Sequence, residues 1–350
     1  MTKILSISNM KPSVEFPNYG VFIENFNSTL LRSHSVDVIA IKKTNNKFIK
    51  TKSYIGLHLC AVQKILLNRY GVIIVHSATH MTLLILVAKL FQMLRIQKVE
   101  IIVYIHGSDL YLDHVSSNIA KLFLSVSRNI SISAANKIFV ASKKMVNKLA
   151  VISEGTRKKI RVVLPTSIPV IFFANTNDVL TSKHRLVLAG RYEIGKDQDL
   201  FFEALKCRAC DTYSIQCVGS GLREEIVKSS AEGLNVTFHD LLNHAELSKV
   251  FKNSDFLIFN SSLNEGLGLL VMEASAAGCI PVLLQNSGVA EHISHSVNGF
   301  VFTTTDEIAD FLANIYEYNI LDIGKIKRHA IENAEHFNKL FKLGVESNIR

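Results

Sequence analysis

Short runs of β-branched and aliphatic residues recur along the chain and alternate with longer stretches of helical periodicity. Continuous apolar runs of this kind are typical of parallel strands whose two faces are both covered by helices. The runs form two series, separated by Pro165–Pro169 and the polar Asn175–Asp178, where we place a hinge. The first series is Lys3–Ser8, Val36–Ile41, Val72–Val75, Glu100–Ile105, Ile138–Val140 and Arg161–Leu164, and the second is Arg185–Ala189, Tyr213–Val218, Val236–Phe238, Phe256–Phe259 and Ile280–Leu284.

Two series of alternating strands and helices predict an α/β protein with two tandem, doubly wound Rossmann-like domains that face a cleft. A chain of 350 residues is long for one domain and ample for two. We expect a first domain at residues 1–168, a second at 169–330, and a helix at 331–350 that crosses back to the first. Ligands of such sheets bind at the carboxyl ends of the strands, so an enzyme acting in the cleft is the first hypothesis.

The most apolar segment, Met81–Ala88, is followed at once by Lys89. It is far shorter than the ~20 residues of a membrane-spanning helix, and it predicts a buried helix instead. The five cysteines are scattered, and Met1–Ser8 is typical of a first strand rather than of a signal peptide. These features favour the cytoplasm.

The charge is distributed unequally between the two halves. Residues 1–168 contain 23 Lys and Arg against 7 Asp and Glu, whereas residues 169–350 contain 16 against 23. The densest basic part is Lys137–Arg161. Such a surface attracts phosphates, nucleic acid or an anionic membrane leaflet, or is simply solvated. Nucleic acid is disfavoured because the chain has no tryptophan and no basic stretch rich in aromatic residues.

Two carboxylates lie in the apolar stretch Asn264–Gly278, which follows a predicted strand. We expect Glu265 on a turn and Glu273 on a helix over Gly268–Ala277 that ends at Gly278. The helical neighbours of Glu273 are apolar, so its carboxylate costs several kcal/mol unless protein groups or ligand hydroxyls donate hydrogen bonds to it. Gly266 and Gly268 admit a ligand close to the backbone, and the amides from Gly268 to Leu270 form an anion site.

The segments Glu265–Val282 and Asn286–Phe302 resemble the donor-site block of glycosyltransferase family 4, whose members have the GT-B fold. Further segments resemble motifs of the same family and occur in the same order, over roughly Lys3–Phe302. These are the glycine loop Pro17–Glu24, the His-Gly loop Ile105–Asp109, the strand end Ile138–Ser142, the Gly-Arg turn Gly190–Lys196 and the segment Val218–Gly221. Several ordered blocks are far more specific than one motif.

The resemblance implies a retaining, metal-independent transferase of the hexosyltransferase type that uses a nucleotide-diphosphate sugar and no cofactor. It implies that Arg191 and Lys196 hold the diphosphate, that Glu273 accepts from the ribose hydroxyls, and that Glu265 binds the transferred sugar. It also places His106 beside the reacting face of that sugar and brings the backbone of Gly20 near the phosphates. The remaining donor-site positions are Asp109, Gly190, Gly219, Gly266, Leu267, Gly268 and Leu269.

The acceptor implied by the resemblance is a saccharide or a lipid-diphosphate-linked saccharide bound mainly by the first domain, in O-antigen, capsule or other surface-polysaccharide synthesis. A lipid-linked acceptor places the protein at the inner face of the cytoplasmic membrane, where the basic first domain would face anionic lipid. We expect this association to involve Lys143, Lys144, Lys148, Lys158 and Lys159. The alternatives are a GT-B-fold nucleotide-sugar epimerase and a non-catalytic scaffold subunit.

Three other motifs are assigned no catalytic role. Asp197 and Asp199 have the Asp-x-Asp form of metal-dependent sugar transferases, but they begin a predicted helix and are interpreted as capping residues. Cys207 and Cys210 lack further ligands for zinc. Gly219-Ser-Gly221 lacks the third glycine of a dinucleotide site, which disfavours an oxidoreductase.

Overall fold

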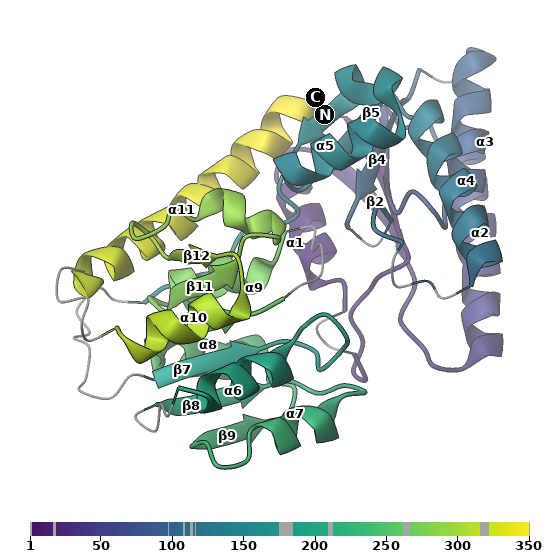
Figure 1. The fold of residues 1–350 in the computed structure, drawn as a ribbon. Coiled ribbons are helices and arrows are strands. Elements are labelled where there is room, and N and C mark those ends of the chain that lie inside the picture. The colour runs from purple at the N-terminus through teal and green to yellow at the C-terminus, as the bar shows by residue number, and fades with distance from the viewer. Residues whose placement is uncertain are drawn as a thin grey trace. The chain divides into compact units, whose positions relative to one another are not determined.

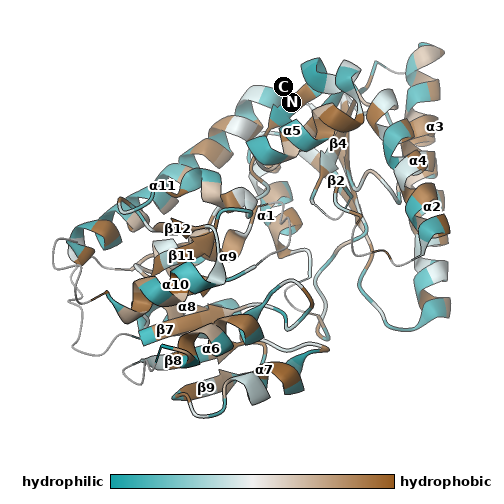
Figure 2. Ribbon diagram, in the orientation of Figure 1, coloured by the Kyte–Doolittle hydropathy of each residue, from teal (hydrophilic) through white to brown (hydrophobic). Residues whose placement is uncertain are grey.

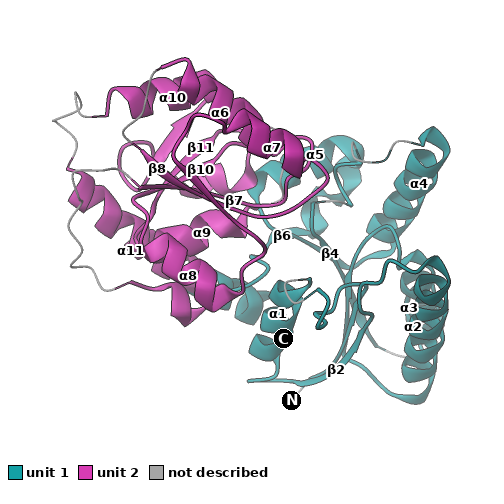
Figure 3. Cartoon of the chain, turned by 90° about the horizontal axis from the view of Figure 1, so that it is seen from below, with its two compact units in different colours: residues 1–167, 339–350 teal, residues 168–338 magenta. Residues whose placement is uncertain are grey.

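A computed structural model describes residues 2–16, 19–96, 98–107, 109–112, 115, 117–174, 185–208, 213–261, 267–315 and 322–349. The chain divides into two compact units, shown in Figure 3. Unit 1 contains residues 1–167 and 339–350, and unit 2 contains residues 168–338. The division falls one residue before the predicted boundary.

The described part of unit 1 is built on a six-stranded parallel sheet in the order β2-β1-β3-β4-β5-β6 (Figure 1). Its strands are β1 (Lys3–Ser8), β2 (Ser35–Ala40), β3 (Val72–His76), β4 (Glu100–Ile105), β5 (Lys137–Val140) and β6 (Ile160–Val162). Its helices are α1 (Val21–Leu30), α2 (Lys47–Leu67), α3 (Thr82–Met93), α4 (Asn118–Ala134), α5 (Lys143–Ile152) and the 3-10 helix η1 (Glu154–Lys159). The central strands β3 and β4 are almost entirely buried, as their unbroken apolar sequences predict.

Helix α3 corrects the prediction of a buried helix at Met81–Ala88. Leu84, Ile85 and Ala88 are buried, but four apolar residues of α3 are exposed, namely Leu83, Leu86, Leu90 and Met93. The segment is apolar all round and yet lies at the surface, packed between α2 and α4. No helix in the described ranges has both the length and the apolar character that crossing a bilayer requires.

Unit 2 repeats this architecture with a six-stranded parallel sheet in the order β12-β11-β10-β7-β8-β9 among the residues described. The strands are β7 (Arg185–Ala189), β8 (Ser214–Val218), β9 (Val236–His239), β10 (Phe256–Phe259), β11 (Ile280–Leu284) and β12 (Phe300–Phe302). The helices are α6 (Gln198–Lys206), α7 (Glu224–Ser230), α8 (His244–Lys252), α9 (Leu269–Ala276), α10 (Thr305–Ala313) and the 3-10 helices η2 (Val170–Phe172) and η3 (Gly288–His292). The prediction missed only the short strand β12.

The last helix, α11 (Ile323–Asn348), begins eight residues before the predicted segment 331–350. Its residues from Lys339 onward group with unit 1. There the ring of Phe341 lies 6.2 Å from that of Phe26 in α1. One buried aromatic residue of α11 thus packs into the core of the first sheet.

Candidate functional site

Each sheet has a point at which its strand order reverses. In unit 2 this point lies between β7 and β10, and in unit 1 it lies between β1 and β3. Ligands of doubly wound sheets bind outside the carboxyl ends of the strands at such points. Arg191 and Lys196 follow β7, and Leu267, Gly268 and α9 follow β10. The predicted donor residues of unit 2 therefore converge on its reversal point.

The loop after β7 holds Arg191 and Lys196 in different surroundings. The Arg191 side chain is 68% exposed, and its guanidinium contacts the carboxylate of Glu193 at 2.8 Å. Lys196 is only partly exposed, and its ammonium lies 5.7 Å from the centre of the Phe259 ring. The ends of β10 fix this loop, because Ser261 donates to the carbonyl of Gly195 at 3.1 Å and Asn260 to that of Asp197 at 2.7 Å.

Gly219 allows the loop after β8 to pack directly against the loop after β7. Its φ of +154° is one that side-chain-bearing residues rarely adopt, and a Cβ there would stand 1.9 Å from the carbonyl oxygen of Gly190. Because no side chain fits, the loop after β8 rests directly on the turn that precedes Arg191. Gly190 and Gly219 are thus required by the backbone path, whatever ligand is bound.

The first residues of α9 lie beside the same aromatic ring as Lys196. A Cβ built on Gly268 would meet Cζ of Phe259 at 3.3 Å and Oγ of Ser287 at 3.3 Å. Leu267 is buried, while Gly268 and Leu269 are partly exposed. The first free amides of α9 and the Lys196 ammonium therefore flank the Phe259 ring, which is a suitable arrangement for an anion.

Glu273 occupies the middle of α9, as predicted, and is only partly exposed. Its carboxylate has no hydrogen bond or ion pair among the residues that the structure describes. Burial raises its pKa to about 7. A carboxyl group in this state stays partly protonated at neutral pH and gains most from donors supplied from outside the protein.

Two predicted residues of this loop, Glu265 and Gly266, lie outside the described residues. As predicted, Asp197 stands at the start of α6, at its N-cap, although its side chain makes no cap hydrogen bond there. Asp199 lies in the first turn and pairs with Arg223 at 2.5 Å. This pair joins α6 to the start of α7.

In unit 1, His106 follows β4 and forms a pair with His76 at the end of β3. Nε2 of His106 lies 3.0 Å from Nδ1 of His76, and the rings are stacked with an angle of 6° between their planes. Burial lowers the pKa of His76 to about 3, and burial together with His76 lowers that of His106 well below its ordinary value. Both imidazoles are therefore neutral at physiological pH.

The hydrogen-bond pattern assigns the protons of this pair. Nε2 of His76 is buried without a partner in the described structure, and a buried N–H is the costlier group to leave unpaired. We therefore place the proton of His76 on Nδ1, where it is donated to Nε2 of His106. Because Nε2 of His106 accepts this hydrogen bond, the single proton of its neutral ring is on Nδ1, where it is available to a ligand acceptor.

Asp109 is buried and organises the loop after β3. Its Oδ1 accepts hydrogen bonds from Ser77 at 3.0 Å and from Thr79 at 2.7 Å. Gly20 stands at the N-cap of α1 with φ +86°, and a Cβ there would meet the Met10 backbone carbon at 2.8 Å. One turn into α1, the Phe22 ring makes an edge contact with His106 at 5.0 Å. The predicted residues of unit 1 are thus held around the carboxyl ends of β1, β3 and β4.

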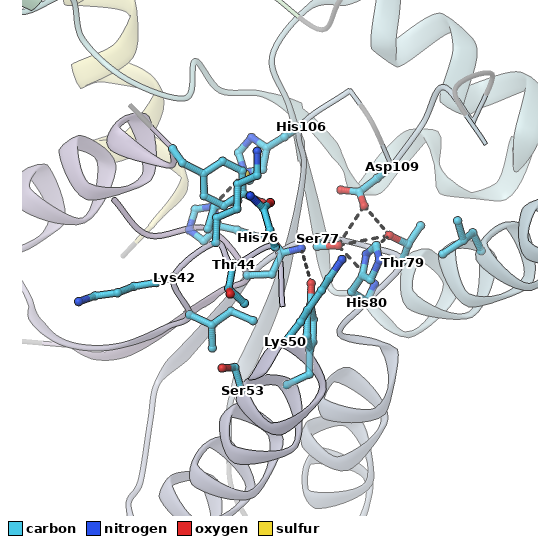
Figure 4. Close-up of a pocket in the computed structure, with 18 of the residues that line it drawn as sticks. Lys42, Thr44, Lys50, Ser53, His76, Ser77, Thr79, His80, His106 and Asp109 are labelled. Atoms are coloured by element: carbon cyan, nitrogen blue, oxygen red, sulfur yellow. Dashed lines mark hydrogen bonds between the residues drawn. The ribbon is translucent and has the colours of Figure 1, made fainter. Parts of the chain in front are cut away.

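A cavity of about 530 Å³ opens at these strand ends (Figure 4). Figure 4 shows the histidine pair on one side of it and Asp109 with Ser77 and Thr79 on another. The sequence reasoning missed most of its wall, although the polar residues that follow strands β2 and β3 are a signal for it. The missed lining includes Lys42, Lys43, Lys47, Lys50, Ser53, Tyr54, His76, Ser77, Thr79 and His80.

None of the four cavity lysines forms an ion pair with a carboxylate in the described part of the chain. Among the described residues, Asp109 is the one acid that lines the cavity. The cavity is therefore electropositive, and its walls offer hydroxyl and amide groups for a polyol. Within the described ranges, no group of three or more His, Cys, Asp or Glu side chains is placed to hold a metal ion.

Comparisons with known proteins show what unit 2 and the whole chain are similar to. Residues 174–337 match the family model of Glycosyl transferases group 1. An uncharacterized 41.2 kDa protein in the cps region of Klebsiella pneumoniae is 23% identical over 286 residues, which are 78% of this chain and 77% of that protein.

Among solved structures, HepE of Anabaena in complex with UDP and glucose is similar with a TM-score of 0.70 and 16% identity, over 99% of each chain. The lipopolysaccharide outer core galactosyltransferase WaaB, in its apo form, has a TM-score of 0.66 and 15% identity, over 99% of this chain and 100% of that one. Residues 174–337 are therefore similar to Glycosyl transferases group 1, and the protein has the GT-B fold, as the sequence predicted.

Proposed function

We propose that the protein is a retaining, metal-independent glycosyltransferase that moves a hexose from a nucleotide-diphosphate sugar to a hydroxyl of a saccharide acceptor in surface-polysaccharide synthesis. The observation that supports this most is the partly buried carboxylate of Glu273 in the middle of α9, which has no hydrogen-bond donor among the described residues. In the proposed complex, the two ribose hydroxyls of the nucleotide donate to it. HepE was solved with UDP and glucose, which favours a uridine nucleotide as the first candidate.

The donor diphosphate is proposed to lie against Arg191, Lys196 and the first amides of α9. Negative charge grows on the leaving group as the glycosidic bond breaks, and fixed positive charge lowers the barrier most where that growth occurs. A guanidinium and an ammonium suit this task without a metal. Glu265 is proposed to bind the sugar hydroxyls, and the backbone of Gly20 to approach the phosphates.

The acceptor is proposed to occupy the cavity of unit 1. Its four lysines favour an acceptor that carries phosphate or carboxylate groups, such as a saccharide on a lipid diphosphate. His106 is proposed to donate from Nδ1 to a hydroxyl of the transferred sugar. The Klebsiella relative lies in a cps region and WaaB acts on lipopolysaccharide, which supports a role in capsule, O-antigen or related polymers. We place this activity at the inner face of the cytoplasmic membrane.

The test is a panel of nucleotide sugars, read first by the shift in melting temperature and then by release of nucleoside diphosphate. A glycosyltransferase is expected to be stabilised by one donor class and to hydrolyse it slowly without an acceptor. Binding without release, together with a change of sugar configuration, would instead favour the epimerase. Failure of every donor to shift the melting temperature would favour the scaffold subunit and overturn the proposal.

A further inference from the structure

The outer surface of helices α2, α3 and α4 is unusually apolar for a protein exposed to water. α3 packs between α2 and α4, and the three helices cover one face of the first sheet. Of the exposed large apolar side chains among the described residues, more than half lie between residues 48 and 130, in these helices and the turn after α3. In Figure 2, hydrophobic residues, in brown, recur along all three ribbons among white and teal ones. Patches of this extent normally mark an interaction site.

The apolar residues form one stripe along each helix. In α2 the stripe is Phe48, Ile55, Leu59 and Leu66, whose spacing of seven, four and seven residues keeps them on one helical face. In α3 it is Leu83, Leu86, Leu90 and Met93, and in α4 it is Ile119, Leu122, Phe123, Val126 and Ile130. Phe48 is 78% exposed, Met93 70% and Ile119 83%. The opposite faces, including Leu57, Leu84 and Ile132, are buried in the core.

The charges on these three helices all have one sign. The three helices contain no aspartate or glutamate, and no acidic residue occurs between Asp37 and Glu100. Lys52 is exposed on α2, and Arg95 and Lys98 are exposed after the end of α3. An apolar face on helices that carry only cations complements a surface that is apolar inside and anionic at its rim. A second copy of this chain complements it less well, because the two rims would carry the same positive charge.

We propose that the faces of α2, α3 and α4 form a membrane-docking surface that lies in the interface of an anionic bilayer. The apolar stripes enter the boundary between headgroups and acyl chains, and Lys52, Arg95 and Lys98 contact anionic headgroups. This changes the site expected from sequence, which was the basic cluster Lys143, Lys144, Lys148, Lys158 and Lys159 on α5 and η1. Lys159 donates to the carbonyl of Ser133 in α4, so that cluster borders the docking surface and extends its positive rim.

The proposal deepens the membrane location given under the proposed function, but its test is independent of catalysis. Full-length protein is mixed with vesicles of phosphatidylcholine alone, or with added phosphatidylglycerol, and bound protein is measured by sedimentation. The variant I55Q/L59Q/L66Q/L90Q removes apolar contacts from two stripes. These side chains are more than half exposed, so the fold should tolerate the changes. The control L222Q/L241Q changes two exposed leucines of unit 2.

The wild type and the control should bind the mixed vesicles alike, and the stripe variant should bind at least about tenfold more weakly. The variant K52Q/R95Q/K98Q should lose the preference for phosphatidylglycerol. No binding by the wild type, or equal binding by the stripe variant, would overturn the proposal. A dimer that the stripe variant dissociates, without vesicle binding, would show that a second copy covers this face instead. Vesicle binding without nucleoside diphosphate release would leave the surface intact and refute the proposed function.

Discussion

The two units share one architecture and have opposite chemistry. Each is built on a six-stranded parallel sheet with a reversal point, and each gathers polar residues there. The first 168 residues are strongly basic and the remainder is acidic. At the carboxyl ends of its strands, unit 1 keeps neutral histidines whose pKa values are lowered, whereas unit 2 keeps Glu273, whose pKa is raised to about 7.

The difference shows that a shared fold leaves function to side chains near the strand ends. In unit 2, Arg191, Lys196 and a carboxylate without a donor among the described residues suit a nucleotide with its phosphates and ribose. In unit 1, lysines that form no ion pair within the described ranges line the cavity and suit an anionic acceptor, and apolar helices suit lipid. The two units should therefore respond differently to substitution and to pH.

The largest effect is expected from Arg191→Ala, which should lower turnover at saturating donor by about 100- to 1,000-fold. The Arg191 side chain is mostly exposed, and its one ion pair in the described structure is with Glu193, so the loss would not reflect unfolding. The measurement is the rate of nucleoside diphosphate release. As a control, Arg208→Ala breaks pairs with Asp306 and Asp310 elsewhere in unit 2 and should retain turnover. Equal rates for the wild type, Arg191→Ala and Arg208→Ala would show that Arg191 does not act in the donor site.

The crossing of two loops in unit 2 should be the next most sensitive feature. Gly219→Ala places a Cβ 1.9 Å from a carbonyl oxygen and should lower the free energy of unfolding by about 3 kcal/mol. Gly233→Ala is a matched control, because Gly233 also has positive φ but open space around it. It should cost only about 1 kcal/mol. Urea unfolding of both variants measures the difference, and similar losses would contradict the tight crossing.

Acid should destabilise unit 1 through the histidine pair. The pKa of His76 is about 3 in the folded chain and about 6.5 when unfolded, so the unfolded state binds more protons below pH 6.5. Stability is then complete above that pH and falls by about 2 kcal/mol for this group by pH 5. The stability of unit 1 is measured by hydrogen exchange in peptides from that unit. The His76→Phe variant should make unit 1 less sensitive to acid. An unchanged pH profile would show that His76 does not titrate as described.

A rise in pH should have the opposite effect and lower the stability of unit 2. The pKa of Glu273 is raised from 4.5 to about 7, so its protonated form stabilises the folded state and this contribution is lost as pH rises from 4.5 to 7. Glu273→Gln should therefore stabilise the ligand-free protein at pH 8 by about 1–2 kcal/mol, a value reduced for partial exposure. Hydrogen exchange in peptides of unit 2 measures this gain. Glu246→Gln, which removes an exposed capping carboxylate, should give no such gain.

Most of the fold followed from the sequence because buried parallel strands are continuous apolar runs. Only β12, three residues long, escaped prediction. The turn that carries Arg191 and Lys196 and the helix that carries Glu273 were also predicted, because the motifs around them fix the local backbone. The cavity lysines were not, because exposed lysines after a strand look the same whether they line a cavity or a plain surface. The apolar face of α3 was missed because hydrophobicity alone predicts burial.

Calorimetry of nucleotide binding tests the central claim most directly, namely that Glu273 accepts hydrogen bonds from the donor's ribose. The ligand is the nucleoside diphosphate that most raises the melting temperature, and buffers of different ionisation enthalpy report the protons exchanged. At pH 6.5 the wild type should release a fraction of a proton on binding, because ribose donors favour the ionised carboxylate. Glu273→Gln should bind at least about tenfold more weakly and release none. Equal affinity and equal proton release in the two proteins would contradict the account.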